Sequence, residues 1–144
     1  MEQRLSLVTL GVADLAVSRA FYERLGWTAH KASSKDIVFF PANGLVFGLF
    51  SRAELAKDVG ILDDGSGFRA VTLAYNTRSK SEVDAVIADA ERAGGRVVKQ
   101  PHATFWGGYS GYFADPDSHL WEVAFNPHWN IRPDGSMDMD TKLK

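Results

Sequence analysis

The sequence predicts an α+β fold built from two copies of one strand–helix–three-strand unit. Strand-like and helix-like hydrophobic patterns follow one another in the same order in both halves of the 144-residue chain. The triplet VTL at residues 8–10 recurs at residues 71–73, at the same place in the second copy. Repetition at this scale indicates two copies of one supersecondary unit. Because neither copy is large enough to bury a good core alone, we expect the two to pair.

The first copy starts with an apolar, strand-forming run over residues 5–12. Asp14 then offers an N-cap for a helix that Gly26 ends. Pro41 and the residues after it form a turn between the last two strands of this copy. The three predicted strands after the helix span residues 28–33, 36–42 and 45–51.

The second copy repeats this order, starting with a strand over residues 68–77. Ser79 and Glu82 have the spacing of a capping box at the start of a helix, and Gly94 stops that helix. The three predicted strands after the helix span residues 95–101, 107–115 and 118–126. We therefore expect one domain over 1–126 (module 1, 5–50; linker, 51–67; module 2, 68–126) and a polar C-terminal tail over 127–144.

Composition excludes several classes of function. The chain has 16 Lys and Arg against 18 Asp and Glu, for a net charge of −2, and no basic block that would attract nucleic acid. It has no cysteine, which excludes disulfides, thiolate nucleophiles and cysteine-ligated zinc. No apolar run is long enough to span a membrane and the start has no secretory pattern, so we expect a cytoplasmic protein.

Two segments resemble a known family. Residues 10–27 (LGVADLAVSRAFYERLGW) are similar to the first strand and helix of the vicinal oxygen chelate superfamily, which includes glyoxalase I, the bleomycin resistance proteins and extradiol dioxygenases. Residues 111–127 (GYFADPDSHLWEVAFNP) are similar to that superfamily's final D-P-D-G-x-x-x-E hairpin. The resemblance covers residues 5–126. It implies two paired βαβββ modules that form an open β-cup with helices outside, and a homodimer, with or without modules exchanged between chains.

The same resemblance implies where metal-dependent members hold their divalent cation. The last-strand carboxylate falls on Glu122, whereas the other positions fall on Leu7, on Phe47 or Gly48 depending on register, and on Ala70. Glu122 alone among these supplies a metal donor, and a zinc site needs about three or more donors. We therefore predict no metal and no other cofactor, and the sequence speaks against glyoxalase I or extradiol dioxygenase activity.

Glu122 has two interpretations. In the first, it is an inherited carboxylate that hydrogen-bonds a buried neighbour such as Thr9, Thr72 or a tyrosine. In the second, it is a general acid/base or a polar anchor for a ligand, and burial without a cation would raise its pKa towards neutrality. Strand alternation supports the placement of Glu122 on the cup side, because it shares a face with small residues while Trp121 and Val123 point the other way.

Other cup-lining residues follow from strand alternation and from the aromatic, glycine-rich segment 102–112. The expected ligand contacts are Leu7, Thr9, Phe39, Phe47, Gly48, Phe50, Ala70, Thr72, Trp106, Tyr109 and Tyr112. The aspartates and proline of residues 115–118 are turn residues and need no functional role.

These observations lead to three hypotheses. The first is a metal-free small-molecule-binding protein with an aromatic-lined cup, in the manner of the bleomycin resistance proteins. The second is a metal-independent isomerase or lyase that uses Glu122 as general acid or base. The third is a metal-dependent lyase or dioxygenase completed by loop histidines or by the partner chain.

Overall fold

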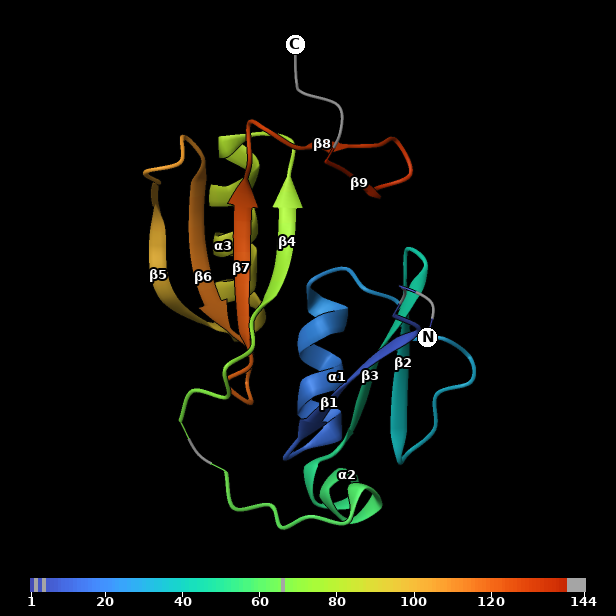
Figure 1. Cartoon of the computed structure of the whole chain (residues 1–144). Helices are drawn as coiled ribbons and strands as arrows, with labels where there is room; N and C mark the ends of the chain where they lie inside the picture. The colour runs from blue at the N-terminus through green and yellow to red at the C-terminus, as the bar shows by residue number, and fades with distance from the viewer. Residues whose placement is uncertain (2, 4, 66, 140–144) are drawn as a thin grey trace. The chain divides into compact units, whose positions relative to one another are not determined.

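The computed structural model describes residues 1, 3, 5–65 and 67–139 (Figure 1). The end of the predicted tail, residues 140–144, lies outside the described residues. The chain divides into two compact units, Met1–Arg69 and Ala70–Lys144. In chain order the elements are β1 (Leu7–Val12), α1 (Leu15–Arg24), β2 (Ile37–Ala42), β3 (Leu45–Ser51), α2 (Arg52–Val59), β4 (Leu73–Thr77), α3 (Lys80–Ala93), β5 (Arg96–Ala103), β6 (Tyr109–Ala114), β7 (Leu120–Phe125), β8 (Asn130–Ile131) and β9 (Met137–Asp138).

The two units repeat one strand topology. In unit 1 the order is β1-β3-β2, with β1 parallel and β2 antiparallel to β3. In unit 2 the order is β4-β7-β6-β5, with β4 parallel and β6 antiparallel to β7. The core of the predicted repeat is therefore confirmed, and unit 2 adds β5 as a fourth strand beside β6.

The strand predicted over residues 28–33 does not form, and that prediction was wrong. The segment has only local contacts with β2: the His30 amide donates to the Phe39 carbonyl over 2.7 Å, and the Phe39 amide donates to the Ser33 hydroxyl over 2.9 Å. The Ser33 amide also turns back to the His30 carbonyl. A serine side chain thus replaces a neighbouring strand as the acceptor for β2, which is how Ser competes with regular secondary structure.

The helix starts follow the sequence. The Asp14 carboxylate accepts from the amides of Ala16 and Val17 at 2.9 and 3.0 Å, as predicted for an N-cap. In unit 2, Ser79 accepts from the Glu82 amide at 3.2 Å, and the Glu82 carboxylate accepts from the Arg78 amide at 2.8 Å. This is a capping box in which the glutamate reaches the residue before the N-cap.

The core of unit 1 is an aromatic cluster between α1 and its sheet. Tyr22 of α1 lies with its ring centre 4.9 Å from that of Phe47, and Trp27 lies 5.2 Å from Phe47 and 5.7 Å from Phe40. Tyr22 and Phe40 are also in ring contact. Edge-on arrangements of this kind add to the energy of burial. The cluster fixes which face of this sheet carries the helix.

The segment expected as a linker, 51–67, contains helix α2. Ser51 caps that helix, accepting from the Glu54 amide. Arg52 then donates to the Asp63 carboxylate and to the Gly65 carbonyl, each at 2.6 Å, which ties the following stretch to α2. In the expected tail, β8 and β9 form a two-stranded hairpin. Among the described residues, no helix has the length and apolar character needed to cross a membrane.

The four-stranded sheet of unit 2 carries α3 on one face (Figure 1). Val83, Ile87, Ala90 and Ala93 are the buried residues of α3. On the same side of the sheet, the rings of Phe113 and Trp121 stack with their centres 6.1 Å apart. We call the opposite side of this sheet the helix-free face.

Replacing Phe47 with alanine should cost far more stability than replacing Phe39 with alanine. Phe47 is 4% exposed inside the aromatic cluster, whereas Phe39 is half-buried. We expect Phe47→Ala to lower the free energy of unfolding by about 3–5 kcal/mol and Phe39→Ala by less than half of that. Chemical denaturation of both variants measures the difference. Equal losses would contradict the assignment of these side chains to opposite faces.

Candidate functional site

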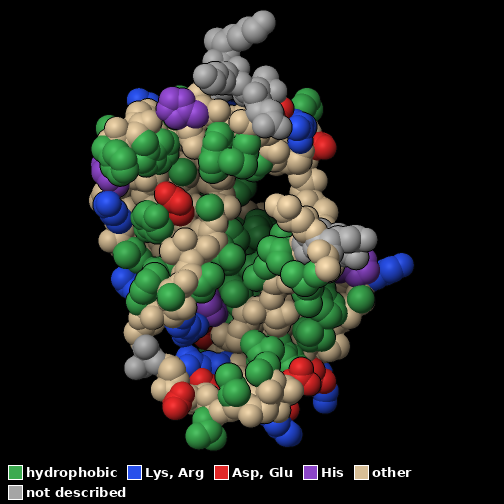
Figure 2. All heavy atoms as spheres, viewed as in Figure 1, with side chains coloured by type: hydrophobic (Ala, Val, Ile, Leu, Met, Phe, Trp, Pro, Cys, Tyr) green, Lys and Arg blue, Asp and Glu red, His purple; other side chains and the backbone are tan. Residues whose placement is uncertain are grey.

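The helix-free face of unit 2 carries Glu122. On β7, Trp121 and Val123 are buried towards α3, and Glu122 alternates to the other side, where it is half-buried. Figure 2, which views this sheet from the side opposite α3, shows an acidic side chain among hydrophobic ones over the strands. The alternation predicted for the last strand is therefore present in the structure.

Tyr112 is the immediate neighbour of Glu122. The two residues lie directly opposite each other on β6 and β7. Burial raises the pKa of the Tyr112 phenol above its ordinary 10.0, and the nearby charge of Glu122 and a side-chain hydrogen bond to that carboxylate raise it further. The phenol of Tyr112 thus keeps its proton beside the Glu122 carboxylate. Of the partners expected for this carboxylate, the structure supplies a tyrosine.

Strand register extends this pair into two rows of side chains on the same face. The first row runs across β5, β6, β7 and β4, and the second row lies one step along the sheet. Directly opposite residues on neighbouring strands point to the same face. The first row is Lys99, Tyr112, Glu122 and Ala74, and the second is His102, Ser110, Ala124 and Asn76.

Sequence reasoning missed Lys99, His102, Ser110 and Asn76. Ser110 and Asn76 could have been found by counting two residues along each strand from the Glu122 row. Lys99 and His102 could not, because β5 shifts register twice, once before Lys99 and once between Lys99 and His102. Such bulges break the simple alternation from which a face is read.

Three predicted contacts of the second module lie elsewhere. Tyr109 belongs to the α3 side, where its hydroxyl donates to Asp84 over 2.9 Å. Ala70 and Thr72 precede β4 and are exposed, and Ala70 has a φ of +56°, outside extended backbone. The strand predicted from residue 68 therefore begins later, at Leu73.

Trp106 lies in the turn between β5 and β6. The Thr104 amide donates to the Gly108 carbonyl over 3.0 Å, and the Gly107 amide donates back to Thr104. The Trp106 ring fills the space that a side chain at Gly108 would need, so glycine is required there. Because side chains alternate along a strand, position 108 lies on the same face of the sheet as Ser110 and Tyr112. Nε2 of His128 donates to the Trp106 carbonyl over 3.2 Å and ties this turn to the segment after β7.

In unit 1, described by itself, part of the predicted set shares one face. Thr9, Gly48 and Phe39 form a row across β1, β3 and β2, on the side away from α1. A side chain at position 48 would contact the Thr9 hydroxyl and the Phe39 ring, so glycine leaves room between them. By alternation Phe50 lies on this face, as does Leu7, which is 44% exposed.

Phe47 does not lie on that face. It packs against Tyr22 and Trp27 on the α1 side, so the prediction that it lines the cup was wrong. The sequence left the choice between Phe47 and Gly48 to the register, because a one-residue shift moves a side chain to the other face of a strand. The structure places Gly48 on the helix-free side.

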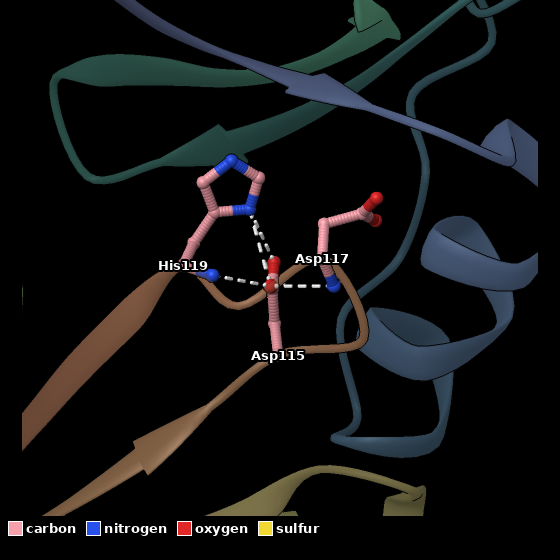
Figure 3. Close-up of polar contacts among 3 residues, drawn as sticks. All are labelled: Asp115, Asp117 and His119. Atoms are coloured by element: carbon pink, nitrogen blue, oxygen red, sulfur yellow. Dashed lines mark hydrogen bonds and ion pairs between the residues drawn. The ribbon is translucent and has the colours of Figure 1, made fainter. Parts of the chain in front are cut away.

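The turn between β6 and β7 holds a buried Asp115–His119 pair (Figure 3). Nδ1 of His119 donates to the Asp115 carboxylate, 2.9 Å away, and the amides of Asp117 and His119 donate to the same carboxylate at 3.0 and 2.8 Å. The side chains are 0% and 7% exposed. This histidine stabilises the turn, and its position after β6 agrees with the structural role expected for residues 115–118.

The residues do not fit the divalent cation that metal-dependent members of this fold hold. Glu122 is a donor, but Leu7, Gly48 and Ala70 stand at the other expected positions and have no donor side chains. Within residues 1, 3, 5–65 and 67–139, no three His, Cys, Asp or Glu side chains come together as a metal-binding group. Since cation sites need several convergent donors, we derive no chemistry through a metal.

Comparison with known proteins agrees with this fold and hairpin. The model of the Glyoxalase/Bleomycin resistance protein/Dioxygenase superfamily matches residues 4–123. This chain belongs to that superfamily. The α+β class predicted from the sequence is thereby confirmed. No curated protein matches the chain.

Solved structures of this superfamily are similar to the chain over nearly its whole length. A glyoxalase-related enzyme from Fulvimarina pelagi is 38% identical with a TM-score of 0.86, covering 95% of this chain and 98% of that one. A lactoylglutathione lyase from Agrobacterium tumefaciens is 23% identical with a TM-score of 0.63, covering 87% of this chain and 95% of that one. The second likeness shows the fold alone.

Replacing Glu122 with glutamine should lower the pKa of Tyr112 without restoring it fully. The substitution removes the negative charge, but burial, the largest cause of the shift, remains. Near-ultraviolet absorbance during alkaline titration follows the phenol, and Tyr112→Phe identifies its transition. Because the folded state favours the protonated phenol, the stability it contributes is present below pH 10.0 and is lost as the pH rises through the raised pKa.

Asp84→Asn is the matched control for this titration. It removes the charge and weakens the hydrogen bond that raise the pKa of Tyr109, and should leave the Tyr112 transition in place. A Tyr112 transition that does not move in Glu122→Gln would contradict the pairing of Tyr112 with Glu122.

Proposed function

We propose that this protein binds a small organic ligand with an apolar or aromatic body on the helix-free face of unit 2, without a metal. The observation that carries the proposal is the Glu122–Tyr112 pair. It is a half-buried carboxylate and a protonated phenol, side by side on a sheet face that α3 leaves uncovered. Small-molecule sites are mostly apolar surfaces with a few polar groups that orient the ligand.

The neighbours of the pair support this proposal. Ala74 flanks Glu122 on β4, and Ala124 follows it two residues along β7. Both side chains are small; Ala74 is exposed beside the pair, whereas Ala124 is 5% exposed. Trp106, at the end of the same face, supplies an aromatic ring.

We also propose Thr9, Phe39, Gly48, Phe50 and Leu7 as ligand contacts on the sheet of unit 1. Their shared face away from α1 supports this part of the proposal. A homodimer in the cytoplasm remains part of the proposal as well. The exposed apolar side chains of the chain segment between α2 and β4, among them Ile61, Leu62 and Phe68, support a partner chain.

A metal-independent isomerase or lyase is the second candidate. Tyr112 keeps its phenol proton directly opposite Glu122, which gives a carboxylate next to a hydrogen-bond donor. A carboxylate in this setting can remove a proton from a bound substrate and return it to another atom. The 38%-identical protein from Fulvimarina pelagi is described as a glyoxalase-related enzyme.

Substitution of Ala74 by tryptophan should abolish ligand binding. Ala74 lies opposite Glu122 and is exposed, so a large ring there covers the pair without entering the core. Tyr75→Trp is the control, because residue 75 is exposed on the same strand but alternates to the other face. We expect a thermal-shift screen of small aromatic compounds to give hits with the wild type and Tyr75→Trp, and none with Ala74→Trp.

Glu122→Gln separates the two candidates on the same hits. A binding protein keeps its affinity for uncharged ligands within about tenfold, since the glutamine side chain still offers a hydrogen bond in place of the one to the carboxylate. An enzyme binds but loses turnover, because the amide cannot accept the proton. Hits that survive Ala74→Trp unchanged would place the ligand elsewhere and contradict the proposed face.

A further inference from the structure

We propose that the ligand carries a carboxylate, and that Ser110, Lys99 and His102 bind it on the helix-free face of unit 2. The inference rests on the proposed function, because it assigns the chemical class of the ligand that the Glu122–Tyr112 face takes. The first observation is the Ser110 hydroxyl, for which the described residues supply no hydrogen-bond partner.

Ser110 is 4% exposed, yet its hydroxyl makes no hydrogen bond to any other described residue. A hydroxyl without a protein partner pairs with water where water reaches it, and a ligand oxygen can take the place of that water. In the described part of the chain, Thr104 Oγ1 is the fully enclosed side-chain atom that lacks a partner, so the Ser110 hydroxyl still has access to the outside. The Ser110 hydroxyl can therefore donate a hydrogen bond to a ligand atom.

The residues beside Ser110 on β5 are basic. His102 lies directly opposite Ser110, and Lys99 lies opposite Tyr112, one row away. Arg96 lies opposite Ala114 at the far end of the same strand. β5 therefore presents three basic side chains, of which His102 lies in the row that contains Ser110 and Lys99 lies in the neighbouring row. Positive charge beside an unpaired donor favours an anionic oxygen.

The geometry of His102 leaves one ring nitrogen for a ligand. Its Nδ1 lies 3.1 Å from the Gln100 carbonyl, and since a carbonyl can only accept, Nδ1 carries a proton. Nε2 is then the ring nitrogen left for a ligand, and it can donate to a carboxylate only when it also carries a proton, in the imidazolium. The bulge that brings this part of β5 close is permitted by Gly111, where a side chain would meet the Pro101 nitrogen at 2.9 Å.

Basic and acidic side chains therefore lie on different strands of the helix-free face. The basic side chains are on β5, the Ser110 and Tyr112 hydroxyls are on β6, and the Glu122 carboxylate is on β7. Neighbouring strands are about 4.8 Å apart, so Lys99 and Glu122 are separated by about 10 Å across the sheet. That span fits a small aromatic acid whose carboxylate lies at β5 and whose ring lies over Tyr112 and Ala124.

The test compares three aryl acids with their primary amides, which have the same shape without the charge. The probes are phenylacetate, 3-phenylpropionate and 1-naphthylacetate, measured by calorimetry and ligand-observed NMR. We expect at least one acid to bind about tenfold or more tightly than its amide, as for a hydrogen-bonded charge. Ser110→Ala and Lys99→Met should each remove most of that preference and leave amide binding unchanged.

Lys80→Met, at the exposed start of α3, is the matched control and should keep the preference for the acid. The melting temperature of each variant verifies its fold, so that lost binding is not lost structure. Equal binding of acids and amides in the wild type would overturn the carboxylate inference and leave the proposed face intact. Binding of none of the six probes would contradict the proposed function as well.

Discussion

The Asp115 carboxylate holds the register on which the candidate site depends. It accepts hydrogen bonds from the backbone amides of Asp117 and His119 and from the His119 ring. The Asp115 side chain is fully buried. Ser118 takes a φ of +65° to close the same turn. With the turn length fixed, Tyr112 must lie opposite Glu122. A slip of one residue would move Glu122 to the α3 side as an unpaired buried carboxylate, and would move Trp121 and Val123 out to the helix-free face, both at a high cost.

The two units share one strand topology but differ in the turn of the last hairpin and in the number of strands. In both units the first strand runs parallel to the last, and the last two strands form a hairpin. Unit 1 closes its hairpin with Asn43 and Gly44, both at positive φ, a tight two-residue turn. Unit 2 uses the longer turn around Asp115, and adds the bulged strand β5. The polar groups of the candidate site come from this second, elaborated version.

Features that depend on residues close together in the sequence were predicted correctly, and features that depend on distant residues were not. Asp14 and the pair Ser79 and Glu82 were correctly predicted because a cap depends on residues within one turn of a helix. The predicted side of β7 for Glu122 was correct because large and small side chains alternate along that strand. On β3 nearly every residue is apolar, so alternation could not decide between Phe47 and Gly48. The contacts that decide it come from Tyr22 and Trp27, which are distant in sequence.

The misses have related causes. Residues 28–33 read as a strand, but Ser33 supplies from its side chain the hydrogen bond that a strand would supply from its backbone. Tyr109 was assigned to the ligand because it is aromatic in a glycine-rich segment, whereas its partner is Asp84 of α3. Lys99 and His102 were hidden by the bulges of β5, which no periodic pattern reveals. Interactions between distant elements and irregular backbone therefore limit what sequence alone can place.

The most direct test of the binding face is an amide chemical-shift map recorded while 1-naphthylacetate is added to the full chain. We predict that the largest changes occur at Ser110, Tyr112, Glu122 and Ala124, on two adjacent strands and one face. Changes concentrated on α3 would place the ligand on the covered side of the sheet. That result would contradict the assignment of Glu122 and Tyr112 to a ligand-binding surface.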